Sequence, residues 1–110
     1  MMRAYELMVI IDGDVEDAKA QSWIKTIVDE IGKADGTVHG KPDWWGKRPF
    51  AYQINKKSSG YYLVLECLAV GGALDELERQ LRLADEVVRH KLLRLPDAEA
   101  ARRGMTGAAA

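Results

Sequence analysis

The sequence predicts an α+β domain in which two helices cover one face of a four-stranded antiparallel sheet, in the order β-α-β-β-α-β. Apolar residues recur at three- and four-residue spacing in two segments, 14–31 and 74–83, as they do in amphipathic helices. Segments rich in β-branched and aromatic residues surround these two: 3–11, 37–54, 61–69 and 86–95. A chain of 110 residues suits one domain with a single core.

The first segment, 3–11, is apolar on both of its alternating faces, which is typical of a central strand. An acidic turn follows, and we expect Asp14 to cap the next helix, with Glu16 and Asp17 in its first turn. One apolar stripe runs along that helix: Ala20, Ile24, Ile27, Val28 and Ile31. The pattern predicts a central strand followed by a helix that packs on the sheet.

The second extended segment, 37–54, is long for one strand and contains Pro42 and Gly46. Proline cannot donate a hydrogen bond to a central ladder, and glycine within a strand often marks a bulge. We therefore expect an edge strand with an irregular middle, whose regular end alternates large and small side chains at 50–54. A turn at 56–60 leads to the third strand, which forms a hairpin with the second.

The second helix is acidic at its start and basic toward its end, as the helix dipole favours. The fourth strand, Glu86 to Leu95, interleaves apolar and basic residues without a clear pairing parity. Beyond Pro96 the chain is rich in alanine and has little to bury. The sequence therefore predicts a folded domain over residues 1–95 and a flexible tail over 96–110.

The formal net charge of −1 gives the whole molecule no long-range attraction for phosphate, so any contact with nucleic acid must come from local patches. The only cysteine, Cys67, suits a reducing compartment, and no segment reads as a signal peptide or membrane span. His39 and His90 lack metal-ligand spacing, and Asp12 and Asp14 have no nucleophile near them in sequence. We expect a cytoplasmic protein that is not an enzyme and uses no cofactor, metal or small-molecule substrate.

The segment Gly46–Ile54, read as Gly-Lys-Arg-Pro-Phe-Ala-Tyr-Gln-Ile, resembles the signature of the bacterial small-subunit ribosomal protein S-six family. Phe50 stands where the family has leucine, and Pro49 stands where a polar or basic residue is usual. The proline removes one possible RNA contact and one ladder donor. The resemblance runs from about Arg3 to Leu95. Further matches lie in the first strand, the second helix and the fourth strand: 3–6, 77–83 and 87–89.

This resemblance implies a ferredoxin-like fold without catalysis. It also implies that the chain binds the central domain of small-subunit (16S) ribosomal RNA beside ribosomal protein S-eighteen, with which members of the family pair. A protein held by a partner as well as by RNA does not need a large positive charge, which agrees with the net charge of −1.

Cations that can share one rim or face of the sheet are our candidates for RNA contact, because each one placed at a phosphate adds affinity. The RNA-binding candidates are Arg3, Arg48, Lys56, Lys57, Arg89, Lys91 and Arg94, together with Tyr5, which lies near Arg3 at the start of the first strand. Adjacent strand residues point to opposite faces, so one of the two neighbouring tryptophans is exposed unless both pack beneath a bulge. The candidates for contact with a partner protein are Trp44, Trp45 and Lys47.

Two other functions fit the same pattern. A ferredoxin-like regulatory or ligand-binding domain that homodimerises through its open sheet face is one alternative, with the basic segments as ordinary surface. A free binder of single-stranded RNA is the other, suggested by Tyr61 and Tyr62 in the third strand. The first strand lacks the matching aromatic motif of RNA-recognition modules, so these tyrosines read better as sheet residues.

Overall fold

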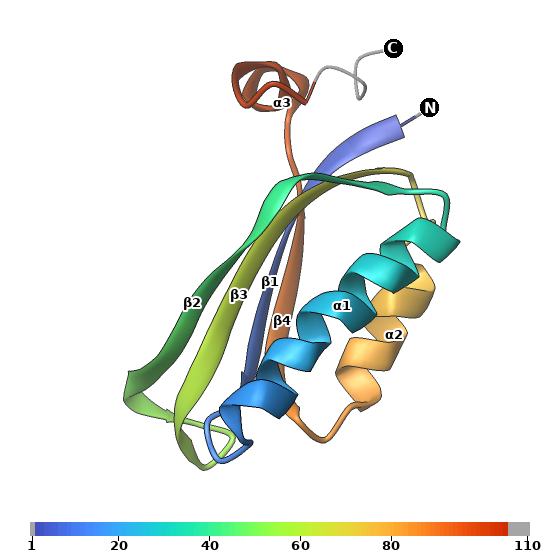
Figure 1. The fold of residues 1–110 in the computed structure, drawn as a ribbon. Coiled ribbons are helices and arrows are strands. Elements are labelled where there is room, and N and C mark those ends of the chain that lie inside the picture. The colour runs from blue at the N-terminus through green and yellow to red at the C-terminus, as the bar shows by residue number, and fades with distance from the viewer. Residues whose placement is uncertain (1, 106–110) are drawn as a thin grey trace.

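The computed structural model describes residues 2–105 and confirms the predicted sandwich. Four antiparallel strands form one sheet in the order β2-β3-β1-β4, and α1 and α2 lie together on one of its faces (Figure 1). A third helix, α3, lies close to the end of the sheet where β1 begins (Figure 1). The elements are β1 (Met2–Asp12), α1 (Asp17–Lys33), β2 (Thr37–Ile54), β3 (Lys57–Val70), α2 (Asp75–Leu83), β4 (Val87–Arg94) and α3 (Asp97–Arg102).

The main core lies between the sheet and the two long helices. β1 pairs with β3 on one side and β4 on the other, so it is central, as its apolar faces predict. Alternate residues of β1 and β3 point toward the helices and meet the apolar stripes of α1 and α2. The largest fully buried side chains here are Leu7, Ile11, Ile27, Ile31, Leu63, Leu65 and Leu81. Burial of each contributes roughly 2 kcal/mol, which makes this layer the main source of stability.

β2 is an edge strand with an irregular middle, as predicted. Its pairing with β3 shifts register after His39, after Trp44 and after Pro49. The hairpin turn, however, is at Asn55 and Lys56 rather than at 56–60: both residues have positive φ, 49° and 65°, and β3 already begins at Lys57. Two consecutive residues with positive φ are typical of a two-residue type I′ turn, and asparagine adopts this conformation more readily than most residues.

The tip of this hairpin reaches across the sheet. The side-chain amide of Asn55 donates a hydrogen bond to the carbonyl oxygen of Val88 in β4, at 3.0 Å. The backbone N–H of Gly13 donates to the carbonyl of Ser59 at 3.1 Å, which ties β3 to the chain just after β1. The tip therefore lies beside the first residues of β4, although β2 and β4 are opposite edges of the sheet.

The start of α1 differs from the prediction. Glu16 occupies the N-cap position without a side-chain cap, and the helix begins at Asp17. Asp14 instead belongs to a tight turn: its backbone N–H donates to Oδ1 of Asp12 at 2.9 Å, and Val15 N–H donates to the carbonyl of Asp12 at 3.1 Å. The sequence predicted that Asp14 caps the helix, whereas the structure has a turn that the Asp12 side chain stabilises.

Part of the predicted flexible tail is folded. Residues 97–102 form α3, and Ala100 and Met105 are buried against Ala4, Leu95 and the half-buried Leu68. This small cluster lies on the face of the sheet away from α1 and α2, because Ala4 alternates with the core-facing residues of β1. Two apolar side chains within an alanine-rich segment give little periodic signal, which is why the sequence did not predict this helix. Residues 106–110 of the predicted tail lie outside the described part of the chain.

Candidate RNA and protein interface

Two cations lie along β4 on the open face of the sheet, the face away from α1 and α2, and a third lies at the neighbouring hairpin tip. Arg89 and Lys91 are exposed and pair in register with Ile10 and Met8, whose side chains alternate with the core positions of β1. Lys56 joins them from the hairpin tip, because its neighbour Asn55 is hydrogen-bonded to β4. We call Lys56, Arg89 and Lys91 the β4 basic strip. Its members come from segments more than thirty residues apart.

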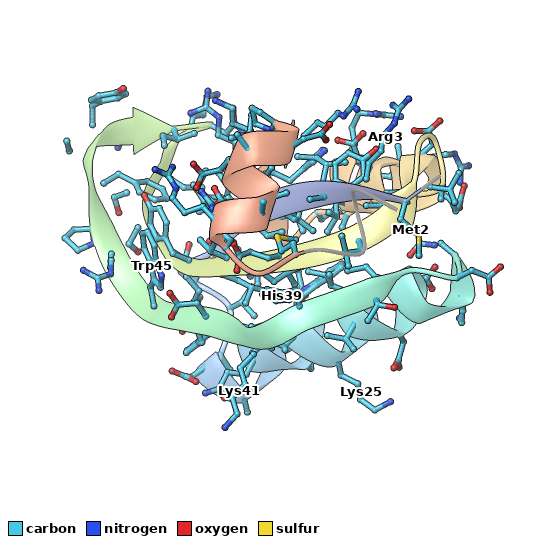
Figure 2. The ribbon with its side chains drawn as sticks, turned by 90° about the horizontal axis from the view of Figure 1, so that it is seen from above. Met2, Arg3, Lys25, His39, Lys41 and Trp45 are labelled. Atoms are coloured by element: carbon cyan, nitrogen blue, oxygen red, sulfur yellow. The ribbon has the colours of Figure 1, made fainter. Side chains whose placement is uncertain are left out.

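Two further arginine candidates lie apart from this strip. Arg94 is exposed and pairs with Tyr5, so it is on the helix-facing side of β4. Arg3 is exposed at the start of β1, and its guanidinium packs beside Gly71, where an added Cβ would be 2.8 Å from it. Figure 2 shows Arg3 and Trp45 well apart, on opposite sides of the view. The structure does not gather all the predicted RNA contacts into one surface.

Two residues that were predicted to contact RNA are instead engaged in contacts within the protein. Tyr5 is only 8% exposed and belongs to the main core, so its ring offers no surface to RNA, and its assignment is corrected. Lys57 is half-buried and pairs with Asp12, with Nζ 2.9 Å from Oδ2. The hydrogen bond from Lys57, followed by that from the Asp14 backbone N–H, lowers the pKa of Asp12, and the same contact raises the pKa of Lys57.

This ion pair predicts a pH dependence of stability. A carboxyl whose pKa is lower in the folded than in the unfolded chain stabilises the fold above its unfolded value, and the contribution disappears as the pH falls through the folded value. Asp12→Asn is therefore expected to make the loss of stability below about pH 4 shallower than in the wild type. Urea unfolding between pH 2.5 and 7 measures it. Asp14→Asn, with a carboxylate 85% exposed and 3.9 Å from Lys57, is the control. If the free energy of unfolding fell equally steeply with pH below about pH 4 in the wild type and in Asp12→Asn, the prediction would be contradicted.

An aromatic patch occupies the open face over β2 and β3. Trp45 is 44% exposed and stacks on Tyr62, with ring centroids 5.7 Å apart and planes 11° apart. Phe50 meets Tyr62 edge-on at 6.2 Å, and the guanidinium carbon of Arg48 lies 5.8 Å from the centroid of the Trp45 ring. We call Trp45, Phe50, Tyr62 and Arg48 the aromatic patch. Stacking and the cation–π contact hold the exposed indole in one orientation.

The two adjacent tryptophans point to opposite faces, and one is exposed, as predicted. Trp44 is half-buried and stacks on Tyr61 at 5.5 Å beside the main core, so it contributes packing rather than an exposed ring. This corrects its assignment to the partner surface. Lys47 is exposed but pairs in register with Tyr61, on the helix-facing side of β2. Of the three predicted partner residues, the open face therefore presents Trp45 alone.

Sequence reasoning missed an ionic cluster on the open face. Glu6 and Glu66 are direct partners in the pairing of β1 with β3, and Nη1 of Arg103 lies 2.8 Å from a carboxylate oxygen of each. Nε of Arg103 lies 2.6 Å from Glu99, and His39 Nε2 is 3.0 Å from the Arg103 carbonyl oxygen. Hydrogen bonds to Glu6 and then to Glu66 raise the pKa of Arg103. Once the register is known, two directly opposed glutamates indicate that a cation from elsewhere in the chain lies between them.

Metal-ligand geometry, cysteine reactivity and membrane-spanning length can each be checked for the described residues. Within residues 2–105 no three His, Cys, Asp or Glu side chains are grouped so that they can hold a metal ion. Burial raises the pKa of the Cys67 thiol to about 11, which keeps it protonated and unreactive at neutral pH. None of the helices in this part of the chain is long and apolar enough to cross a membrane. The fold and the open face define a ferredoxin-like domain with basic residues along β4 and an aromatic patch over β2 and β3.

Comparison with known proteins identifies the family. The family model described as ribosomal protein S6, the S-six family named above, matches residues 4–94. The small ribosomal subunit protein bS6 of Salinispora arenicola is 44% identical over 93 residues, which is 84% of this chain and 96% of that protein. The same protein of Acidothermus cellulolyticus is 44% identical over 97 residues, covering 88% and 99%. The chain belongs to the ribosomal protein S6 family.

A solved structure agrees with this membership. The crystal structure of 30S ribosomal protein S6 from Thermotoga maritima matches with a TM-score of 0.84 at 30% identity, and the match covers 96% of this chain and 98% of that one. The chain is therefore a small-subunit ribosomal protein, part of the cytoplasmic ribosome, and its role is in translation. Both the ferredoxin-like fold and the family predicted from the sequence are confirmed.

Proposed function

We propose that this protein binds the central domain of 16S ribosomal RNA together with ribosomal protein S-eighteen, with no catalytic role. The observation that carries this proposal is the division of the open sheet face into two surfaces of different chemistry. The β4 basic strip suits phosphate, and the aromatic patch suits an apolar anchor on a protein. Membership in a family of small-subunit proteins supports the presence of both kinds of neighbour.

The basic strip is effective locally although the net charge is −1. Many of the acidic residues lie on α1 and α2 and in the loops beside them, and several are paired with lysine or arginine, such as Asp29 with Lys25 and Glu86 with Lys19. Within residues 2–105 the strip itself forms no ion pair with an acid, so its cations are available to phosphate. Arg48, in the aromatic patch, is a separate positive charge on the same face. Electrostatic attraction then acts on one face rather than on the whole molecule.

Neutralising the strip tests its role in RNA binding. In the double variant Arg89→Gln, Lys91→Gln, we expect weaker binding to a central-domain RNA fragment in the presence of S-eighteen. We also expect the salt slope of log affinity to become smaller by about one unit for each phosphate that the variant no longer neutralises. Filter binding at several salt concentrations measures both quantities. Lys25→Gln, Arg79→Gln is the matched control, since it removes the same charge from α1 and α2.

If the control and the strip variant reduce the slope equally, RNA binding depends on net charge rather than on β4, and this assignment is wrong. The complete protein is tested by fractionation, where we expect it to sediment with small subunits at moderate salt. Recovery only as a free dimer outside ribosomal fractions would instead support a regulatory domain that pairs through its sheet.

A further inference from the structure

The C-terminal segment, residues 96–105, forms a cap over the open face of the sheet. Its apolar contacts are few: Ala100 and Met105 pack on Ala4, Leu68 and Leu95, in a cluster separate from the main core. Arg103 also attaches the segment to the sheet, because its side chain joins Glu6 of β1 to Glu66 of β3 and its carbonyl oxygen lies 3.0 Å from His39 Nε2 of β2. Figure 2, in which His39 is labelled on β2, shows α3 lying close to that residue. A six-residue helix held in this way is easier to detach than any element of the main core.

The position between Glu6 and Glu66 that the Arg103 guanidinium occupies, which we call the seat, requires a cation. Glu6 and Glu66 face each other across neighbouring strands, and like charges at directly opposed positions destabilise a sheet. Removing the cap alone would leave these carboxylates, each about 30% exposed, without their guanidinium. Removing it while another guanidinium enters would leave their pairing intact. The arrival of a second cation would therefore favour detachment of the cap.

The surface beside the seat suits a side chain from a protein rather than from RNA. A hollow of about 320 Å³ runs from the acidic pair to the aromatic patch, and its lining residues are Glu6, Lys41, Asp43, Trp45, Val64, Leu65 and Glu66. Three carboxylates against one lysine repel phosphate and attract arginine. Val64 and the exposed Trp45 ring offer apolar surface for the stem of such a side chain, with its guanidinium at the glutamates.

We propose that the cap is displaceable, and that an arginine-bearing segment of the partner protein takes the place of Arg103 between Glu6 and Glu66. This inference rests on the proposed function, since it needs a protein partner on the open face. The cap then competes with the partner for one seat, and partner binding releases α3 from the sheet. Arg103 is a positioning residue that sets how much of the chain is open to the partner.

The competition has a test in which the same ion pairs are broken from two sides. Arg103→Gln weakens the cap and leaves the seat intact, so we expect affinity for recombinant S-eighteen to rise roughly two- to tenfold. Glu66→Gln added to Arg103→Gln damages the seat when the cap no longer depends on it, so we expect the raised affinity to fall. Arg102→Gln removes an equal charge from an exposed arginine whose ion-pair partner within residues 2–105 is Glu99, and as the matched control it should leave the affinity unchanged. Isothermal titration calorimetry measures all four proteins.

Hydrogen exchange reports on the cap directly. In the free wild-type protein, Arg103 N–H donates to Glu99 at 3.1 Å and Met105 N–H donates to Ala100 at 2.8 Å, and we expect both amides to lose protection when S-eighteen binds. Binding with these amides still protected, or weaker binding by Arg103→Gln, would overturn the displaceable cap and leave the proposed partner standing. Failure of both wild type and Arg103→Gln to bind S-eighteen would overturn the cap and the partner together.

Discussion

Alanine in place of Gly60 is expected to lower the free energy of unfolding by about 2 kcal/mol, because three segments converge on this position. A Cβ there would lie 2.7 Å from Cγ2 of Ile10, 2.8 Å from Cζ of Phe50 and 2.9 Å from the carbonyl oxygen of Ile11. The first two atoms belong to side chains that can shift, but the carbonyl belongs to the central strand β1. Relieving the clash must therefore separate β1 from β3 or lift the hairpin from the open face.

Gly32 provides the matched control. Near the end of α1, a Cβ added to Gly32 meets no heavy atom within 4 Å, so Gly32→Ala is expected to stabilise the protein by about 0.5–1 kcal/mol through helix propensity and the restricted unfolded chain. Chemical denaturation of both variants, fitted with a common slope, measures the two free energies of unfolding. If Gly60→Ala were as stable as the wild type, the carbonyl oxygen of Ile11 in β1 could not lie as close to Gly60 of β3 as described.

The spacing of apolar residues predicted those features of the fold that depend on one strand or helix alone. The two-sided apolar character of β1 predicted its central place, and the proline and glycine of β2 predicted an irregular edge. The apolar stripes of α1 and α2 predicted that both helices pack on one face of the sheet. These features are local, since the spacing along one segment determines which side chains can be buried together.

The rest depends on contacts between distant segments. Nothing in the order of residues placed Lys56 beside β4, because the Asn55 turn and its bond to Val88 set that position. Nor did it place Arg103 between Glu6 and Glu66, since the like-charged pair exists only in the observed register. Tyr5 is buried because it lies on the face of β1 that points toward the helices. Both faces of β1 are apolar, so the sequence did not indicate which of them this would be. The candidate RNA surface was therefore predicted as a set of cations, whereas the structure divides it into separate locations.

Removal of the Trp45 ring is expected to lower affinity for S-eighteen by roughly 10- to 30-fold, about 1.4–2 kcal/mol, if the aromatic patch anchors the partner. The indole is already held by its stack on Tyr62 and by its cation–π contact with Arg48. It therefore loses little freedom when a partner packs against it, and this preorganisation makes an exposed tryptophan an effective anchor. Trp45→Ala is the test, with affinity measured by calorimetry.

The same substitution has a smaller expected effect on folding, because Trp45 lies outside the main core and its stack on Tyr62 is worth about 0.5–1.5 kcal/mol. Trp45→Phe keeps an aromatic ring on Tyr62 and should recover part of the affinity. Leu83→Ala, at a 64% exposed position on α2, removes apolar surface from the opposite side of the molecule and should leave binding unchanged. A Trp45→Ala protein that binds S-eighteen as well as the wild type would move the partner away from the aromatic patch. A decrease in affinity equal to the decrease in stability would reduce Trp45 to a packing residue.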